Sequence, residues 1–329
     1  MSQLTRRQFQ TLGAAMLGFP AIVRAQGKYP NRPVRVVVPF APGGGTDTLG
    51  RAIAQRLSES LGQPFVIDNK PGASGIIGTD AVAKAVPDGY TLNFNISTAL
   101  LINQFLYTKL PYNPLRDLSM LYKAADGYTI LVVHPSLPVK NGTELMTYIK
   151  ANRNKLSYGS YGQGSFPHLA GAYLDHITNG GMTHSAYKGE APCVQDLIGG
   201  QIHMTWASAF NVKQHVEAGK LKAIGVQGNK RLPSMPNLPT LPESGLEGDA
   251  FELVGWLAMA APARTPMEIQ ELLAAEIRKA FTDPAMKERI EGMGYGMVPD
   301  SGPQNFLADY KRDMPKWEAL VKLSGVKLD

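Results

Sequence analysis

The residues best suited to bind a small anion form one short run: Gly43, Gly44, Gly45, Thr46 and Asp47. Glycine has no side chain to shield the backbone, so a turn of this kind lets a ligand approach its N–H groups closely. A helix that starts after the turn adds the positive end of its dipole. We therefore predict an anion site here, with Thr46 or Asp47 capping the helix.

The spacing of these glycines argues against a nucleotide site. The sequence contains no G-x-G-x-x-G fingerprint, and no Gly-Lys-Ser or Gly-Lys-Thr follows the turn. Neither a dinucleotide-binding turn nor a P-loop is therefore indicated. The expected anion is smaller than a nucleotide.

The run lies between a predicted strand and a predicted helix. Residues 34–38 are mostly valine, which is typical of a buried strand, and apolar residues recur at helical spacing across residues 49–61. Three more glycine-rich turns, at residues 69–75, 159–165 and 188–192, also follow predicted strands. One such turn by itself is usually structural. Four of them favour ligand binding, because ligands of parallel α/β sheets bind beyond the carboxyl ends of the strands.

Strands and helices alternate in two successive stretches of the chain. This pattern predicts parallel βαβ units in two α/β lobes, each a doubly wound sheet with flanking helices. We place residues 26–126 and 250–329 in lobe 1 and residues 127–249 in lobe 2. The chain would then cross between the lobes twice, which is the arrangement of a hinge with a cleft.

Residues 1–25 have the features of an export signal. Arg6 and Arg7 precede an apolar stretch that glycine and proline interrupt, and residues 23–25 resemble a cleavage site. The paired arginines favour the twin-arginine (Tat) route, whereas Gln10 is unusual for that signal and leaves the Sec route open. Either route would place the mature chain outside the cytoplasm.

Composition argues against several other functions. The formal charge of +6 falls to +3 once the signal and its three arginines are removed, and no basic run indicates nucleic acid. Cys193 is the single cysteine, so no internal disulfide can form. The six histidines are scattered without ligand spacing, so no metal site and no cofactor is expected. No stretch after the signal has the length and apolarity of a transmembrane helix.

Eight short segments occur in an order that resembles the Bug family, the extracytoplasmic solute receptors of tripartite tricarboxylate transporters. They are residues 34–47, 69–78, 87–92, 110–114, 187–189, 196–201, 218–221 and 239–240. The similarity extends over nearly all of the mature chain. It implies a type II periplasmic-binding-protein fold, a small organic carboxylate held between the lobes, a periplasmic location and membrane transporter subunits as partners. We expect a monomer that binds no nucleic acid.

The resemblance also implies a set of ligand-binding residues. Those of lobe 1 come from the first two glycine-rich turns: Phe40, Ala41, Gly44, Gly45, Thr46, Asp47, Gly72, Ala73 and Ser74. Ser97 is a further candidate because of its position, just past the end of the predicted strand at residues 90–95. Those of lobe 2 come from the other two turns: Ser160, Gly164, Ser165, His168, Tyr187, Gly189 and Ala191. In this family ordered waters often mediate such contacts, as suits a polar site.

Two positions depart from the family pattern. His203 stands where members often carry aspartate, and Trp206-Ala207 replaces a common Phe-Asp pair. Loss of an acid at the cleft rim would remove a contact to an amine or a bridging water, and Trp206 would offer a stacking face. This favours an aromatic or apolar-bodied carboxylate. Alternatively, His203 is an ordinary strand residue and Trp206 belongs to the core of its lobe.

The function favoured by these features is a non-enzymatic receptor that captures a small carboxylate, either aromatic or a dicarboxylate, for a tripartite tricarboxylate-type transporter. One alternative is an exported hydrolase that uses Ser165 and His168, with Asp196 orienting the base. It is disfavoured because the sequence has no G-x-S-x-G nucleophile elbow. The other alternative is a subunit that presents its ligand to a membrane kinase, which the sequence does not separate from a transport receptor.

Overall fold

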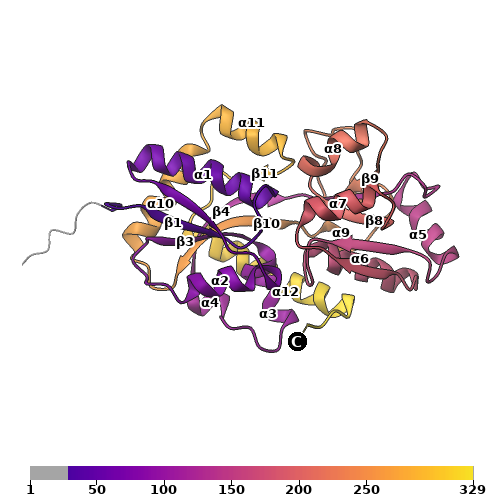
Figure 1. The fold of residues 1–329 in the computed structure, drawn as a ribbon, viewed down its shortest axis with the longest axis horizontal. Helices are drawn as coiled ribbons and strands as arrows, with labels where there is room; N and C mark the ends of the chain where they lie inside the picture. The colour runs from indigo at the N-terminus through magenta and orange to yellow at the C-terminus, as the bar shows by residue number, and fades with distance from the viewer. Residues whose placement is uncertain (1–28, 329) are drawn as a thin grey trace, which may run out of the picture.

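The computed structural model describes residues 29–328, which form two α/β lobes side by side (Figure 1). The first lobe is built on a six-stranded sheet of order β11-β4-β10-β3-β1-β2, and the second on a five-stranded sheet of order β7-β6-β8-β5-β9. The predicted fold class, two α/β lobes with flanking helices, is confirmed. The predicted export signal, residues 1–25, lies outside the described residues.

The first sheet has a parallel part around its valine-rich strand. Its strands are β1 (Val34–Val38), β2 (Phe65–Asn69), β3 (Thr91–Ile96), β4 (Leu118–Gly127), β10 (Gly255–Pro262) and β11 (Gly296–Met297). β1 runs parallel to both β2 and β3, with Val34 opposite Phe65 and Val36 opposite Leu92. Helices cover both faces of this sheet (Figure 1), and four of the five β1 residues are buried. Burial on both faces explains the nearly continuous run of valines.

The second sheet repeats the parallel arrangement. Its strands are β5 (Ile130–Val133), β6 (Ser157–Ser160), β7 (Thr183–Ala186), β8 (Met204–Ala207) and β9 (Lys222–Val226). β6 is parallel to β7 and β8, whereas β5 is antiparallel to β8 and β9. The predicted parallel βαβ units are therefore confirmed around β1 and around β6.

Helices connect these strands and cover the sheets. Those joined to the first sheet are α1 (Gly45–Leu61), η1 (Ala73–Gly75), α2 (Ile76–Ala83), η2 (Thr98–Ile102), α3 (Asn103–Leu106), α4 (Pro114–Asp117), α10 (Met267–Ala280), α11 (Pro284–Gly292) and α12 (Pro303–Ser324). Those that follow β5 are α5 (Gly142–Ala151), α6 (Phe166–Thr178), α7 (Glu190–Ile198), α8 (Ala209–Glu217) and α9 (Asp249–Glu252). Among residues 29–328, no helix combines the length and the apolarity that a membrane span requires.

Two strands of the first sheet, β4 and β11, have no counterpart in the sequence prediction. β4 pairs antiparallel with β10, and β11 is only a two-residue extension beside it. β4 contains Lys123, which is 7% exposed and whose ammonium lies 2.7 Å from Asp126 Oδ1. A buried lysine interrupts the apolar pattern by which a strand is predicted. Asp126 is in the same strand, and folding brings a second acid, Asp309, to 3.8 Å from the Lys123 ammonium.

The two lobes are joined by two chain crossings and by the C-terminal helix. The chain passes from one sheet to the other between β4 and β5 and returns between β9 and β10. α12 packs against β4 of the first lobe and α6 of the second. At this contact Trp317 and Phe166 meet edge to face, with ring centroids 6.0 Å apart. One hydrophobic core cluster therefore includes residues of both lobes.

Candidate ligand-binding site

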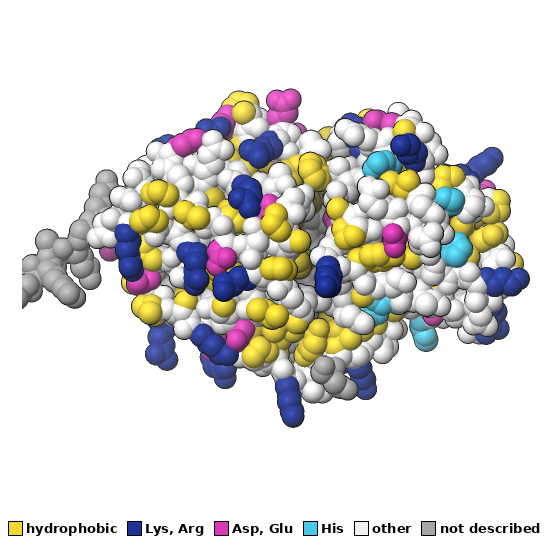
Figure 2. All heavy atoms as spheres, in the orientation of Figure 1, with side chains coloured by type: hydrophobic (Ala, Val, Ile, Leu, Met, Phe, Trp, Pro, Cys, Tyr) yellow, Lys and Arg dark blue, Asp and Glu magenta, His cyan; other side chains and the backbone are white. Residues whose placement is uncertain are grey.

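A cavity of about 330 Å³ lies between the lobes. Figure 2 shows apolar side chains on both sides of the seam where the lobes meet. The residues that line the cavity are Phe40, Ala41, Pro42, Gly44, Gly45, Thr46, Asp47, Ile96, Ser97, Thr98, Gly127, Thr129, Tyr161, Phe166, Lys188, Gly189, Glu190, Ala191, Pro192, Ser208, Gly255, Trp256, Leu257 and Tyr295. A mainly apolar wall with a few polar groups is typical of a site for a small molecule.

The start of α1 supplies backbone N–H groups to this cavity. The helix begins at Gly45, and the first N–H that bonds back into it is that of Thr48, which donates to Gly44 O at 2.9 Å. Gly44, Gly45 and Thr46 line the cavity, and their N–H groups have no acceptor within the helix. Together with the helix dipole, these groups form a site suited to an anion.

The predicted cap at Thr46 or Asp47 is wrong. Gly44 is the N-cap residue, and no side chain makes a cap hydrogen bond. The reason is that the Asp47 carboxylate has other partners: it accepts the Gly43 N–H at 3.0 Å, Arg51 Nε at 2.9 Å and Asn69 Nδ2 at 2.9 Å. Asp47 therefore holds the turn in place from inside the first lobe.

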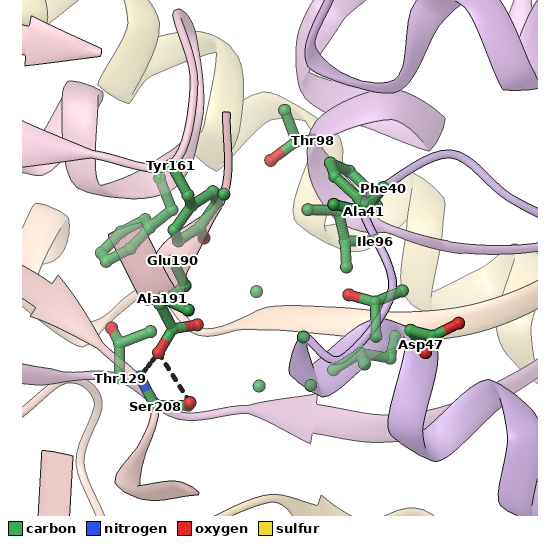
Figure 3. Close-up of a pocket in the computed structure, with 18 of the residues that line it drawn as sticks. Phe40, Ala41, Asp47, Ile96, Thr98, Thr129, Tyr161, Glu190, Ala191 and Ser208 are labelled. Atoms are coloured by element: carbon green, nitrogen blue, oxygen red, sulfur yellow. Dashed lines mark hydrogen bonds between the residues drawn. The ribbon is translucent and has the colours of Figure 1, made fainter. Parts of the chain in front are cut away.

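The charge of Asp47 is compensated within the first lobe. Burial by itself would raise the pKa of Asp47, but hydrogen bonds from Arg51, Gly43 and Asn69 hold that pKa below its ordinary value. The side chain is 3% exposed. In Figure 3 its carboxyl group lies on the side away from Glu190. Asp47 thus leaves the adjacent N–H groups free to attract an anion.

Figure 3 shows the two walls of the cavity facing each other: Phe40, Ala41, Ile96 and Thr98 on one side, and Thr129, Tyr161, Glu190, Ala191 and Ser208 on the other. α7 begins at Glu190, with Gly189 as its N-cap, and α8 begins at Ala209, with Ser208 as its N-cap. Two helix N-termini of the second lobe therefore adjoin the cavity.

Glu190 is the acidic residue of the second wall. Its Oε1 atom accepts hydrogen bonds from the Ser208 backbone N–H and from Ser208 Oγ, the latter at 2.7 Å. Burial raises the pKa of Glu190, and the hydrogen bonds from Ser208 oppose that rise. The N–H and the hydroxyl group of Ser208 together hold the Glu190 carboxyl group in one orientation beside the cavity.

Aromatic rings form much of the remaining lining: Phe40, Tyr161, Phe166, Trp256 and Tyr295. Burial raises the pKa of the Tyr161 and Tyr295 hydroxyl groups, and the nearby charge of Glu190 raises both further. Both phenols are therefore neutral over the physiological pH range. Both hydroxyl groups lie near enough to Glu190 for its charge to act on them.

Nine of the predicted ligand-binding residues line the cavity: Phe40, Ala41, Gly44, Gly45, Thr46, Asp47, Ser97, Gly189 and Ala191. They come from the first glycine-rich turn, from the residue after β3 and from the start of α7. The fold brings these three segments to one place, because each follows the carboxyl end of a strand.

The second turn, which contains Gly72, Ala73 and Ser74, lies outside the cavity lining. Ala73 and Ser74 belong to η1, and Gly72 is the N-cap residue of that short helix. The Ser74 hydroxyl donates a hydrogen bond to the carbonyl oxygen of Gln163 in the second lobe, and Asn103 Nδ2 donates to the Ser74 carbonyl oxygen at 3.3 Å. In this structure the second turn connects the two lobes beside the cavity.

The predicted residues of the third turn also lie outside the lining: Ser160, Gly164, Ser165 and His168. Ser165 Oγ donates to the Gly162 carbonyl oxygen at 2.7 Å, and His168 Nδ1 accepts the Gly164 N–H at 2.9 Å. Both side chains therefore bond to the backbone of their own turn. Within residues 29–328 no hydrogen bond joins Ser165 to His168, as a nucleophile and base would require.

The acid considered for the hydrolase alternative has another partner as well. Asp196 Oδ2 accepts the Tyr187 hydroxyl at 2.8 Å, and neither residue lines the cavity. His168 stacks on His184 with ring centroids 3.7 Å apart. These residues form packing and turn contacts of the second lobe, and their geometry does not assemble a catalytic triad.

The two departures from the family pattern lie away from the cavity lining. Trp206 and Ala207 are 0% exposed; Trp206 belongs to the hydrophobic core cluster that spans both lobes, and Ala207 to one within the second lobe. This burial fits the alternative that Trp206 is a core residue and does not stack on the ligand. His203 Nδ1 accepts the Ser157 N–H at 3.0 Å, so this histidine has a backbone partner beside its strand.

Several lining residues were not singled out from the sequence, among them Tyr161, Glu190, Ser208, Trp256 and Tyr295. Glu190 lies between two predicted residues, so its position in a glycine-rich turn was a usable signal. Tyr295 lies in the turn between α11 and β11 and carries no such signal. Only tertiary packing brings it to the cavity.

Two α/β lobes that enclose a small cavity, with helix N-termini on both walls, define a two-lobed solute-binding protein. The profile of the tripartite tricarboxylate transporter family receptor, TctC, matches residues 49–326, and the chain belongs to this receptor family. A UPF0065 protein of Pseudomonas sp. strain P51, from the tcbD-tcbE intergenic region, is 37% identical over 313 residues, which are 94% of this chain and 92% of that protein.

Solved structures of similar proteins support the same relationship. Rpa4515 of R. palustris, solved with adipate, has a TM-score of 0.85 and 33% identity and covers 91% of this chain and 99% of its own. The periplasmic binding protein BugD has a TM-score of 0.83 and 35% identity, with the same coverage of 91% and 99%. MatC of Rhodopseudomonas palustris, with bound malate, has a TM-score of 0.82 and 29% identity, with coverage of 89% and 100%. The predicted resemblance to Bug receptors is confirmed.

Proposed function

We propose that this chain is a periplasmic receptor that captures a small organic carboxylate and delivers it to the membrane subunits of a tripartite tricarboxylate-type transporter. The start of α1 carries the proposal: Gly44, Gly45 and Thr46 line the cavity, and their N–H groups have no acceptor within the helix. A carboxylate is one of the anions that such a helix start binds. The adipate and malate bound by two similar receptors support the ligand class.

The second wall completes the binding site. The start of α7, at Gly189 and Ala191, offers polar backbone to the ligand from the side opposite α1. A ligand favours closure of two lobes only through contacts with both. Residues 26–126 and 250–329 then move as one lobe and residues 127–249 as the other, after export and removal of residues 1–25.

A ligand screen tests this function. Thermal unfolding would be followed with monocarboxylates, dicarboxylates and aromatic acids, because a ligand at about 100 times its Kd stabilises by about 2.7 kcal/mol. We expect at least one of these acids to raise the midpoint temperature of unfolding. Calorimetry with that acid should give one binding site per chain. Small-angle scattering should show compaction with that acid. A chain that no carboxylate stabilises would contradict the proposal.

A further inference from the structure

One oxygen of the Glu190 carboxylate, Oε2, is free to accept a hydrogen bond from a ligand in the cavity. The two hydrogen bonds that it accepts, from the Ser208 N–H and hydroxyl, both go to Oε1. Within residues 29–328, Oε2 accepts none that meets the geometry of a hydrogen bond. In Figure 3 the carboxyl group extends from the second wall toward the space between the lobes.

No cation of the protein is paired with this acid. Among residues 29–328, no lysine, arginine or histidine lies within ion-pair distance of Glu190. The acid of the facing wall differs in this respect, since Asp47 Oδ2 is paired with Arg51 Nε at 2.9 Å. Lys188 lines the same cavity but is exposed to solvent and forms no such pair with Glu190. The cavity therefore contains one compensated acid and one uncompensated acid.

Burial raises the pKa of Glu190, and hydrogen bonds to its carboxylate oppose that rise. Two donors converge on Oε1, and hydrogen bonds to a carboxylate stabilise its charged form. Glu190 is itself the first residue of α7, and Ser208 is the N-cap of α8. Negative charge at a helix N-terminus is favourable. Burial outweighs these effects in the pKa of Glu190, and a cationic ligand group would offset the cost of burying the charge.

The rings around Glu190 suit the same kind of ligand group. Tyr161 and Tyr295 are close enough for its charge to raise the pKa of both hydroxyl groups. Phe40, Phe166 and Trp256 complete the aromatic part of the lining. Aromatic faces attract ammonium groups, including alkylated ones, and give no comparable attraction to a second carboxylate.

We propose that Glu190 forms an ammonium subsite, so that the ligand is an aminocarboxylate zwitterion with its carboxylate at the start of α1 and its ammonium group at the second wall. This inference rests on the proposed function for the carboxylate end of the ligand. A dicarboxylate would instead bring a second negative charge against Glu190, which is unfavourable in a partly buried site.

Matched ligands separate these possibilities by calorimetry. Each trio has one carboxylate in common and differs at the other end: 3-aminopropanoate, succinate and butyrate; 4-aminobutanoate, glutarate and pentanoate; 5-aminopentanoate, adipate and hexanoate. In the best-binding trio we expect the aminocarboxylate to bind about tenfold or more tightly than the dicarboxylate and the monocarboxylate, because a charged hydrogen bond forms only with the amine.

The variant Glu190→Gln removes the charge but keeps an oxygen that can accept the Ser208 N–H. We expect it to lose about tenfold or more in affinity for the aminocarboxylate and to change little for the monocarboxylate. Glu217→Gln is the matched control, since it makes the same change on the exposed last residue of α8. Thermal unfolding of each variant checks folding, and Glu190→Asp provides a second variant that retains the charge.

The outcomes distinguish this inference from the proposed function. If monocarboxylates and dicarboxylates bind but aminocarboxylates do not, the receptor function stands and the ammonium subsite is overturned. A dicarboxylate that binds best and loses affinity in Glu190→Gln would mean that Glu190 is protonated and donates, which also overturns it. If only butylammonium binds, and Glu190→Gln abolishes that binding, the subsite stands and the carboxylate function fails. If no probe binds, both are overturned.

Discussion

Gly45 and Tyr295 pack so closely that a β-carbon on residue 45 would collide with the Tyr295 hydroxyl group. The first turn of α1 therefore meets the turn between α11 and β11 at the cavity. Gly44 differs, because the nearest atom to a β-carbon there is the Ala41 carbonyl oxygen, at 3.9 Å. Its φ of −75° and ψ of 168° also suit any residue. Two adjacent glycines thus have different reasons to lack a side chain.

The variant Gly44→Val should fold normally and bind poorly. The backbone accommodates valine, so we expect the unfolding free energy to change by no more than about 1 kcal/mol. The added side chain would obstruct the N–H groups of the turn, and affinity for the preferred carboxylate should fall by more than about tenfold. Calorimetry and urea unfolding measure the two effects. Gly292→Val, at another open position, serves as the control. Unchanged affinity in Gly44→Val would identify the turn as structural only.

The variant Gly45→Ala should mainly lose stability. Its methyl group would displace the Tyr295 ring, and overpacking of this kind typically costs about 1–3 kcal/mol. Removal of the hydroxyl in the double variant Gly45→Ala/Tyr295→Phe should restore part of that loss, which a double-mutant cycle in urea would measure. Additive effects of the two substitutions would mean that the two residues are not coupled.

The variant Asp47→Ala should destabilise the first lobe by about 1–3 kcal/mol, because it leaves the donors of Gly43, Arg51 and Asn69 without their acceptor. The folded pKa of Asp47 is lowered below 3.8. Its contribution is therefore fully present above pH 3.8 and is lost as the pH falls through the lowered pKa. Urea unfolding of wild type and variant at neutral and strongly acidic pH measures this. Tighter ligand binding by a fully stable Asp47→Ala protein would contradict the role given to this acid.

The variant Trp206→Ala should unfold more easily without changing ligand preference. Trp206 is 0% exposed, and truncation of a buried tryptophan typically costs about 3–5 kcal/mol. A loss of that size interferes with binding measurements, so the milder variant Trp206→Phe provides the binding test. We expect it to bind aromatic and short aliphatic acids with wild-type selectivity in calorimetry. A selective loss of aromatic ligands would instead place the Trp206 ring in contact with the ligand.

Mild acid should weaken the second lobe through its stacked histidines. Burial lowers the pKa of His168 to about 4, and burial together with His168 lowers the pKa of His184 to about 3, from 6.5 for each. At a pH between the folded values and 6.5, the unfolded chain binds protons at these histidines that the folded chain does not bind. Stability therefore falls as the pH drops below 6.5. Urea midpoints measured between pH 7.5 and 5 should show this decline.

A double variant isolates the contribution of the histidine pair. His168→Asn can still accept the Gly164 N–H, and His184→Gln can still contact Ser160 Oγ. With both substitutions, the decline between pH 7.5 and 5 should become smaller. His176→Gln, at an exposed position of α6, should leave the decline unchanged. An equal decline in the double variant would assign the effect to other groups.

Much of the fold could be predicted from local patterns. Apolar spacing and proline starts predict helices at residues 266–281 and 303–323, where the structure has Met267–Ala280 and Pro303–Ser324. The β-branched run at residues 34–38 predicts β1 without error. These patterns succeed because helix periodicity, helix starts and buried strands depend on neighbouring residues. β4 has no such local signal, because Lys123 interrupts its apolar pattern and one of the acids that compensates the lysine, Asp309, comes from α12.

The sequence by itself determined the parts of the site that are local: a glycine-rich turn, the helix after it and the anion-binding backbone that they form. Only the tertiary structure decided which other residues meet that turn. It placed Glu190, Trp256 and Tyr295 around the cavity and enclosed Trp206 in the core. The physical reason is that burial and charge compensation depend on residues distant in the chain, whereas the conformation of a turn depends on its own few residues.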